Sequence, residues 1–418
     1  MKDAASSHKP TVDTTAIRHA QSWMAEHGVD AWLITDFRAS SSSFPRLVPP
    51  LPGQRRWTTR RVAMVIPKVG PARLATSAID EGQFPPAAYP ELEITVFVAW
   101  QQWQAFVQSA APAGATVAMD YSPNCALPVI AQADAGSVEL VREAGLKVVS
   151  SADLMQAAIS RWSPEAVAQH ARASTEVAMV KDEAFALIRS RLASGTPILE
   201  HEAAEFILQR FSELGLESRD CPVVATNEHA ADPHFEPTSK LPTPIKPGDW
   251  ILMDLWARRP GLEHIFSDIT WMAYAAGPGG KHAPTDAQMK VYHTVVAARD
   301  ASLALAQQRW KERVPAYGHE LDDAARNVIV SAGYQRGVKH RTGHSLSSGL
   351  LVHGTGMNLD NLETHDTRVM MAETGFTIEP GIYLASERIG VRSEINVYVD
   401  PAKGPTVTSC VQRELVMV

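Results

Sequence analysis

Two aspartates lie inside apolar stretches that have the character of β-strands. Asp254 lies in the stretch WILMDLWA and Asp268 in the stretch FSDITWMAY, with Pro260-Gly261 between them. This pattern predicts a β-hairpin with one acid on each arm. A carboxylate among apolar residues needs a partner, and two such carboxylates side by side repel each other unless a cation lies between them. An ion pair or a capped turn remains the alternative for either aspartate alone.

Three further residues of metal-ligand type follow later in the chain. His344 lies in Arg-Thr-Gly-His, Glu379 in Thr-Ile-Glu-Pro-Gly-Ile-Tyr, and Glu394 in Gly-Val-Arg-Ser-Glu-Ile. Each of them, taken singly, is more often a satisfied structural residue than a ligand. Together with the two aspartates they form a set of hard, mostly oxygen ligands. Four carboxylates and one imidazole could hold two divalent ions about 4 Å apart, with bridging carboxylates.

Local sequence around these five residues resembles one family of enzymes. Five short motifs are similar, in chain order, to the five-ligand signature of the creatinase/prolidase metallopeptidases, which include methionine aminopeptidase and Xaa-Pro aminopeptidase. These motifs are ILMD, SDIT, TGH, TIEPGIY and R-x-E. The segment ADPHF around His234 and the segment VHG at His353 resemble the two active-site histidine segments of that family. The resemblance covers roughly residues 160–418 well and the first 150 residues more weakly.

The resemblance implies a fold and an activity. The fold is an α/β N-terminal domain of the creatinase type, at residues 1–160, followed by an α+β pita-bread catalytic domain at residues 161–418. The activity is that of a binuclear metal-dependent Xaa-Pro peptidase, of prolidase or aminopeptidase P type. A proline-containing peptide would be the substrate and a homodimer the expected assembly. Manganese would be the usual metal, with cobalt, iron or zinc able to substitute, and the oxygen-rich ligand set agrees with Mn²⁺.

The resemblance also distributes the metal ligands over two sites. Asp268 and Glu394 would bridge both ions. Asp254 would complete one site, and His344 with Glu379 would complete the other. A hydroxide shared by the two ions would be a nucleophile at neutral pH, because the cations lower its pKa.

Catalytic roles follow from the same resemblance. Glu379 would act as the general base, taking a proton and returning it to the departing proline nitrogen. His234 and His353 would donate hydrogen bonds to the substrate and to the tetrahedral oxyanion. Arg392 would orient the Glu394 carboxylate or meet a carboxylate of the substrate.

Departures from the family pattern gather around the substrate rather than the metal ligands. The segment GHSLSSGLLVHG has Ser345 where the family usually has glycine and Gly354 where it usually has glutamate. The hairpin between the two aspartates is a little longer than this family pattern leads us to expect, and the polar insert at 355–368 is unfamiliar. The alternative function is therefore the same fold and metal centre acting on a non-peptide substrate, as a lyase or as an organophosphate or amide hydrolase.

Two other function classes are weaker. The segment Gly343-His344-Ser345-Leu346-Ser347 is similar to the GxSxG motif of serine hydrolases, but it has Ser347 in place of the final glycine. A non-enzymatic binding module on this fold usually loses ligands, whereas all five are present here. The choice between dipeptidase and aminopeptidase stays open at this point. A dipeptidase needs a cation for the product-side carboxylate, and the candidates are Arg341, Arg368, Arg392 and His365.

Apolar periodicity and turn residues predict the elements that must position these residues. The first third predicts a helix over 14–28, strands over 31–35, 61–67, 93–100, 116–120 and 147–149, and a Ser-, Pro- and Arg-rich loop over 39–56. Ser163-Pro164-Glu165 is a helix start because Ser caps and Pro suits the first turn. Later elements are expected as helices to about 194, from 196–197 to 215, 287–310 and 321–333, and as strands at 250–257, 266–274, 376–383, 395–399 and 407–414.

Bulk composition excludes some partners. The 418 residues carry a formal charge of −7 with a pI near 6.1, which argues against nucleic-acid binding because that usually needs a basic patch. No apolar stretch approaches the roughly 18 residues of a membrane span, and the polar first twenty residues contain no apolar signal segment. Three widely spaced cysteines without a CxxC pair predict reduced thiols and a cytoplasmic location.

Overall fold

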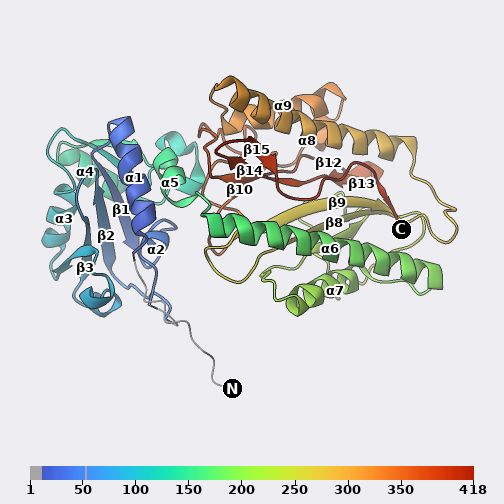
Figure 1. Cartoon of the computed structure of the whole chain (residues 1–418), viewed down its shortest axis with the longest axis horizontal. Coiled ribbons are helices and arrows are strands. Elements are labelled where there is room, and N and C mark those ends of the chain that lie inside the picture. The colour runs from blue at the N-terminus through green and yellow to red at the C-terminus, as the bar shows by residue number, and fades with distance from the viewer. Residues whose placement is uncertain (1–11, 52–53) are drawn as a thin grey trace, which may run out of the picture. The chain divides into compact units, whose positions relative to one another are not determined.

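The computed structural model describes residues 12–51 and 54–418. The chain forms two compact units, one up to Ser160 and one from Arg161 onward, and each is considered by itself (Figure 1). The polar residues 1–11 of the expected N-terminus and two residues of the expected loop at 39–56 lie outside the described ranges.

A mixed β-sheet forms the centre of the first unit. Its strand order is β4-β3-β2-β1-β5-β6, in which β2 runs antiparallel to β1 and β3 while the other neighbours are parallel. The strands are β1 (Ala31–Phe37), β2 (Arg61–Pro67), β3 (Ala72–Ser77), β4 (Leu92–Phe97), β5 (Thr116–Met119) and β6 (Lys147–Ser150). The helices are α1 (Thr14–His27), α2 (Phe44–Leu47), α3 (Trp100–Gln108), α4 (Ala135–Glu143) and α5 (Ala152–Ile159).

The sequence located β1, β2 and β5 because these strands are largely buried and mostly apolar. The predicted helix at 14–28 and the strand at 61–67 are confirmed, and β1 extends two residues beyond the predicted strand. The strand predicted over 93–100 ends at Phe97, and Trp100 begins α3 instead. Strand β3 was missed because its short ARLATS sequence carries no clear apolar run.

Two pairs of helices enclose the strands of the second unit. The predicted long helix is confirmed as α6 (Pro164–Ser194), where the Ser163 side chain accepts a hydrogen bond from the Ala166 N–H. The next helix, α7 (Glu200–Glu213), begins later than predicted because Leu199 pairs with Pro244 in an extended bridge. The other pair is α8 (Asp286–Glu312) and α9 (Gly318–Ser331).

The strands of the second unit form two layers between these helix pairs (Figure 1). One sheet has the order β16-β9-β8-β7 and is covered by α6, and another has the order β10-β11-β14-β15 and lies against α8. β12 and β13 form a separate short hairpin, and β13 contacts α8, β8 and β9. The strands are β7 (Val223–Thr226), β8 (Trp250–Ala257), β9 (Ser267–Tyr274), β10 (Ser345–Leu346), β11 (Gly375–Ile378), β12 (Gly381–Leu384), β13 (Ile389–Arg392), β14 (Ile395–Asp400), β15 (Gly404–Val407) and β16 (Val416–Met417).

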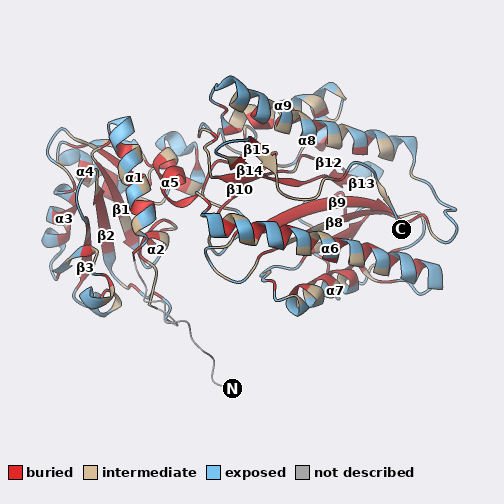
Figure 2. Cartoon of the chain, viewed as in Figure 1, coloured by how far each residue is buried: buried red, intermediate tan, exposed pale blue. Residues whose placement is uncertain are grey.

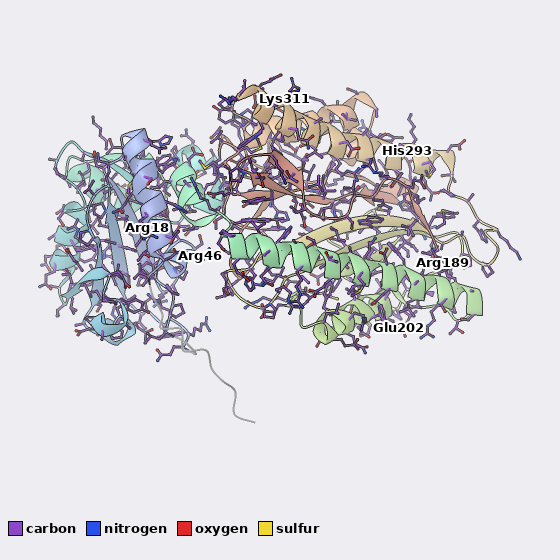
Figure 3. All side chains as sticks on the ribbon, viewed as in Figure 1. Arg18, Arg46, Arg189, Glu202, His293 and Lys311 are labelled. Carbon is purple, nitrogen blue, oxygen red and sulfur yellow. The ribbon has the colours of Figure 1, made fainter. Side chains whose placement is uncertain are left out.

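Burial follows this layering. The strands are buried almost throughout, whereas the helices bury only the face toward the strands (Figure 2). Charged side chains such as Arg189, Glu202, His293 and Lys311 are exposed on the helices (Figure 3). None of the helices in the described ranges combines the length and the apolar character that crossing a bilayer requires.

Two strand predictions near the C-terminus were wrong. The strand predicted over 376–383 is two strands. Strand pairing stops at Glu379-Pro380, because proline has no N–H to donate to a ladder hydrogen bond. The strand predicted over 407–414 is mostly irregular chain between β15 and β16. Glu379 therefore lies at the junction between two short strands.

His170 on α6 makes the stability of the protein depend on pH. Its imidazole is fully buried between the Phe266 carbonyl, at 3.0 Å, and the Thr408 hydroxyl, at 2.7 Å, and burial lowers its pKa to about 4. Unfolding restores a pKa near 6.5, so the unfolded chain takes up a proton first as the pH falls. We expect stability to be lost between pH 6.5 and about 4, by on the order of 3 kcal/mol.

Urea unfolding of the metal-free protein at pH 7 and pH 4.5 measures this loss. The variant His170→Gln keeps a polar side chain without a titrating ring, so its stability should fall less over the same interval. Parallel stability curves for the two proteins would contradict the assignment.

Candidate metal centre

Strand pairing places the two aspartates on one face of a sheet. In the β8–β9 hairpin, Asp254 lies opposite Thr270 and Trp256 lies opposite Asp268. Because residues two apart on a strand share a face, Asp254 and Asp268 are diagonal neighbours on the same face. The predicted hairpin is confirmed, with β8 at the predicted bounds.

The two glutamates meet at the end of another strand pair. Ile378 of β11 pairs with Ile395 of β14, so Glu379, which follows β11, lies beside Glu394, which precedes β14. His344 comes directly before β10, whose Ser345 pairs with Phe376 of β11. Long-range pairing, rather than closeness in sequence, therefore brings these side chains together.

The side chains converge at hydrogen-bonding or ligand distances. Ligand atoms of Asp268, His344 and Glu394 all lie within 4.8 Å of one another. His344 Nε2 is 3.5 Å from Asp268 Oδ2 and 3.4 Å from Glu379 Oε1. Asp254 lies close enough that its charge raises the pKa of Asp268, after the larger effect of burial.

Crowding of buried acids leaves this cluster electrostatically unbalanced. Burial, followed by repulsion from neighbouring carboxylates, raises the pKa of Asp268 to about 7 and that of Glu394 well above its ordinary value. Burial alone would lower the pKa of His344, but Asp268 and Glu379 raise it. The protein lacks enough positive charge here to neutralise these groups, which is the situation that a bound cation resolves.

Two carboxylate oxygens provide a direct test of whether a metal fits. Asp254 Oδ1 and Glu394 Oε1 are buried and have no hydrogen-bond partner. Buried polar atoms are nearly always satisfied, so two free oxygens within one carboxylate cluster indicate a missing partner. Oxygen donors with one imidazole suit hard or borderline divalent cations, and the residues present therefore fit a divalent-metal site.

Arg392 lies within this cluster and is buried. Its guanidinium donates to an Asp254 carboxylate oxygen, to the Thr270 hydroxyl at 3.1 Å and to the Tyr383 hydroxyl at 2.8 Å. The Thr270 hydroxyl in turn donates to Glu394 Oε2 at 2.9 Å. Arg392 thus reaches the Glu394 carboxylate through Thr270, and it pairs directly with Asp254, which the sequence did not predict.

The two histidines with expected catalytic roles differ in their surroundings. The His353 ring lies 4.0 Å from the His344 ring, centroid to centroid. The neighbouring His344, followed by burial, lowers the pKa of His353 to about 3, and the charge of His234 adds to this effect. His234 itself is exposed, and its charge acts on His353.

Glu379 is held between a hydroxyl and a histidine. Thr377 Oγ1 donates to Glu379 Oε1 at 3.1 Å and accepts from the His344 N–H at 3.0 Å. Burial alone would raise the pKa of Glu379, but His344, His340 and Arg392 lower it. These neighbours favour the ionised form of the Glu379 carboxylate, which is the form that can accept a proton.

Sequence reasoning missed several residues that shape the site. Asn396 clamps the backbone of Asp268, accepting from its N–H at 3.0 Å and donating to its carbonyl at 2.5 Å. His340 bonds to the Tyr383 hydroxyl at 2.8 Å. Thr270 could have been found because it lies two residues after Asp268 and so shares its face. Nothing in the local sequence of His340 indicates its partner.

Of the cations considered for binding a product carboxylate, two are held in largely buried ion pairs. Arg368 is buried in an ion pair with Asp366, and Arg392 pairs with Asp254. His365 lies against the His319 ring, 4.4 Å away. Arg341 is bound to Glu363 at 3.3 Å, and its charge acts on His353. Of the three arginines in this set, Arg341 is therefore the one that is outside a buried ion pair, and its charge still acts on the cluster.

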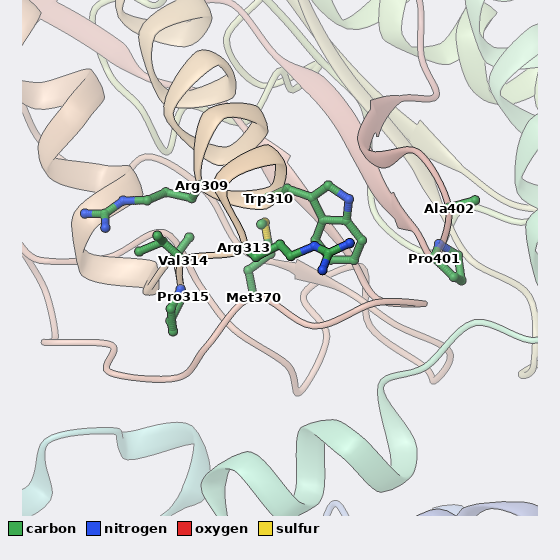
Figure 4. A pocket seen from close by; sticks show the side chains of 9 residues that line it. Arg309, Trp310, Arg313, Val314, Pro315, Met370, Pro401 and Ala402 are labelled. Carbon is green, nitrogen blue, oxygen red and sulfur yellow. The ribbon is translucent and has the colours of Figure 1, made fainter.

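A surface groove lies elsewhere in the second unit. It has a volume of about 440 Å³ and forms around the C-terminal end of α8, where Trp310 and two arginines line it (Figure 4). None of its lining residues belongs to the carboxylate cluster, so the buried acids, rather than this groove, are the place for chemistry.

Comparisons with known proteins extend these observations. The model of metallopeptidase family M24 matches residues 169–401. An uncharacterized peptidase of Schizosaccharomyces pombe is 33% identical over 198 residues, which cover 47% of this chain and 39% of the relative. The chain spans about half or less of the length of the curated relatives it matches.

Solved structures share the fold at low sequence identity. The dipeptidase PepE from Mycobacterium ulcerans is 20% identical with a TM-score of 0.70, covering 97% of this chain and 98% of its own. An X-prolyl aminopeptidase from Caenorhabditis elegans, described as a cytosolic enzyme with a di-nuclear active site, is 15% identical with a TM-score of 0.63, covering 96% and 63%. The predicted combination of an α/β N-terminal part with an α+β pita-bread part is confirmed.

Proposed function

Because the chain belongs to metallopeptidase family M24, we propose that it is a binuclear metal-dependent peptidase that cleaves the bond before proline in short peptides. The observation that carries this proposal is the convergence of Asp268, His344 and Glu394 within 4.8 Å, beside two buried carboxylate oxygens without partners. The dipeptidase and the X-prolyl aminopeptidase among the structural neighbours support this class of substrate.

The five acidic and histidine residues would hold two divalent ions. Asp268 and Glu394 would bridge both ions, Asp254 would complete one site, and His344 with Glu379 would complete the other. When bound, the two ions supply a nucleophile derived from water at neutral pH and polarise the scissile carbonyl. Manganese is the proposed metal because oxygen donors predominate and no cysteine belongs to the set.

The remaining residues handle protons and substrate. Glu379 takes the proton of the attacking water and returns it to the proline nitrogen as the bond breaks. His353 and His234 donate hydrogen bonds to the carbonyl oxygen and to the substrate as negative charge develops. Arg392 keeps Asp254 and, through Thr270, Glu394 in position.

A second candidate function rests on the altered substrate segment. A Cβ at Gly354 would lie 2.5 Å from Ser347 Oγ and 2.9 Å from Ser345 Oγ. The serine hydroxyls therefore occupy the space that a side chain at position 354 would need. This difference from the family pattern at Ser345 and Gly354 favours the alternative in which the same centre acts on a non-peptide substrate.

Activity on a peptide panel decides between these functions. The protein is stripped with chelator, reloaded with Mn²⁺, and assayed on Ala-Pro and Gly-Pro dipeptides and on matching Xaa-Pro tripeptides. We expect proline release that depends on added metal. Cleavage of dipeptides alone would indicate a dipeptidase, with Arg341 as the carboxylate-binding cation. A metal-loaded protein that cleaves no member of the panel would support the non-peptide alternative.

Assembly and location are part of the same proposal. The first unit would be a creatinase-type N-terminal domain that contributes to a homodimer, and the cytoplasm would be the compartment. Cys125 and Cys221 are exposed free thiols, which suits a reducing compartment. Light scattering of the purified chain would test the dimer.

A further inference from the structure

The segment that carries His353 is an irregular loop at residues 347–353, which follows β10. Two hydrogen bonds hold its ends together. The Gly354 N–H donates to the Ser345 carbonyl at 2.6 Å, and the Thr355 N–H donates to the Ser347 hydroxyl at 3.2 Å. In its middle, Leu350 and Leu351 are 49% and 66% exposed. A loop with an exposed middle needs a further tie if it is to hold a side chain against the metal centre.

Arg258 supplies such a hydrogen bond from the connection between β8 and β9. It follows β8 directly and its side chain is 2% exposed. The guanidinium donates to the Gly349 carbonyl of the loop and to Glu217 at 3.3 Å. It also lies over the Phe266 ring, 4.7 Å from the centroid. Because a guanidinium presents its donors in a rigid planar fork, one side chain can join three separate segments.

The backbone at Arg258 is itself fixed. Its N–H and carbonyl exchange hydrogen bonds with Glu217, at 3.0 and 2.8 Å. The position of the guanidinium is therefore set by β8, the strand that also carries Asp254. Burial lowers the pKa of Arg258, and the Glu217 carboxylate opposes that effect. Burying a cation is costly, so it persists where its hydrogen bonds are well satisfied.

We propose that Arg258 is a positioning residue that holds the 347–353 loop, and with it His353, in register with the metal-bearing strand β8. This inference rests on the proposed function, because it assigns His353 a role toward the substrate. Arg258 lies at the start of the connection between the two aspartate-bearing strands, and from there it reaches the Gly349 carbonyl.

The test compares Arg258→Met with Arg259→Met, in the metal-loaded full chain. Arg259 is the adjacent arginine and bonds to Glu176 and the Leu214 carbonyl, away from the loop. Hydrogen exchange followed by mass spectrometry should show faster exchange of the 347–353 amides in Arg258→Met only. On the best Xaa-Pro substrate, kcat should fall by about 10²-fold, since misplacing a catalytic group by about 1 Å has that effect. KM should change little, because an oxyanion donor acts mainly in the transition state.

A second variant keeps the test decisive if Arg258→Met fails to fold. Arg258→Lys retains the charge beside Glu217, but one ammonium cannot reproduce the planar fork. It should fold, with faster exchange in the loop and an intermediate kcat. Unchanged exchange of residues 347–353 in a folded variant would overturn the proposal. A wild-type protein without Xaa-Pro activity would instead count against the proposed function, while the exchange experiment would still decide whether Arg258 holds the loop.

Discussion

Replacing Glu394 with glutamine is expected to abolish activity while leaving the fold intact. The amide keeps the shape of the carboxylate and can still accept the hydrogen bond from Thr270, which lies at 2.9 Å. It removes one negative charge from the position that we propose to bridge the two ions. Metal catalysis supplies several kcal/mol of charge stabilisation, and each 1.4 kcal/mol corresponds to about tenfold in rate. We therefore expect a loss of about 10³-fold or more.

Metal content and thermal stability distinguish this loss from unfolding. The metal-free variant should be at least as stable as the metal-free wild type, because one of several mutually repelling buried acids has been neutralised. Stabilisation by added Mn²⁺, about 2.7 kcal/mol at a hundredfold excess over Kd, should be largely lost. Elemental analysis should find reduced metal.

The control for this variant is Glu373→Gln. Glu373 lies just before β11, whereas Glu379 lies just after it. Glu373 forms a partly exposed salt bridge with Arg161. Its replacement should leave metal content and activity near wild type. Full metal occupancy and full activity in Glu394→Gln would refute the assignment of Glu394 as a ligand.

Replacing Arg392 with methionine is expected to have the largest effect on stability of the metal-free protein. The change leaves Asp254 buried without its cation and also removes the hydrogen bonds to Thr270 and Tyr383. Removing one partner of a buried ion pair costs about 3–5 kcal/mol, because the remaining charge is left uncompensated. Urea unfolding in the presence of chelator measures this cost.

Added metal should narrow the difference between this variant and the wild type. Divalent cations neutralise the same carboxylates, so they partly replace the missing guanidinium. The matched control is Arg388→Met, which removes an arginine from the same hairpin whose side chain is 61% exposed in its pair with Glu228. An exposed pair contributes about 0–1 kcal/mol, so this control should unfold nearly as the wild type does. Equal losses in both variants would contradict the role given to Arg392.

Local patterns were sufficient for the elements that carry the aspartates. The stretch WILMDLWA is apolar except for Asp254, and it forms β8 with the predicted bounds. The Ser-Pro-Glu start of α6 was also readable, because an N-cap acts within one turn of helix. Signals of this kind depend on neighbours in sequence and need no knowledge of the rest of the molecule.

Errors arose where tertiary contacts competed with local signals. The apolar residues around Glu379 suggested one strand, but Pro380 divides it into β11 and β12. The beginning of α7 moved to Glu200 because Leu199 is drawn into an extended bridge with Pro244. At Leu199 a local preference was overruled by pairing with a distant segment, whereas at Glu379 the effect of the neighbouring Pro380 was overlooked.

The residue types of a metal centre are readable from this sequence alone, because five acidic or imidazole side chains interrupt apolar stretches in a recognisable order. Only the tertiary structure decided how far apart these side chains lie and which partners they have. It pairs Arg392 with Asp254, Asn396 with the Asp268 backbone, and Arg258 with the Gly349 carbonyl. The physical reason is that a side chain's type is a local property, whereas its partners are chosen by strand register and packing between segments that lie more than ninety residues apart.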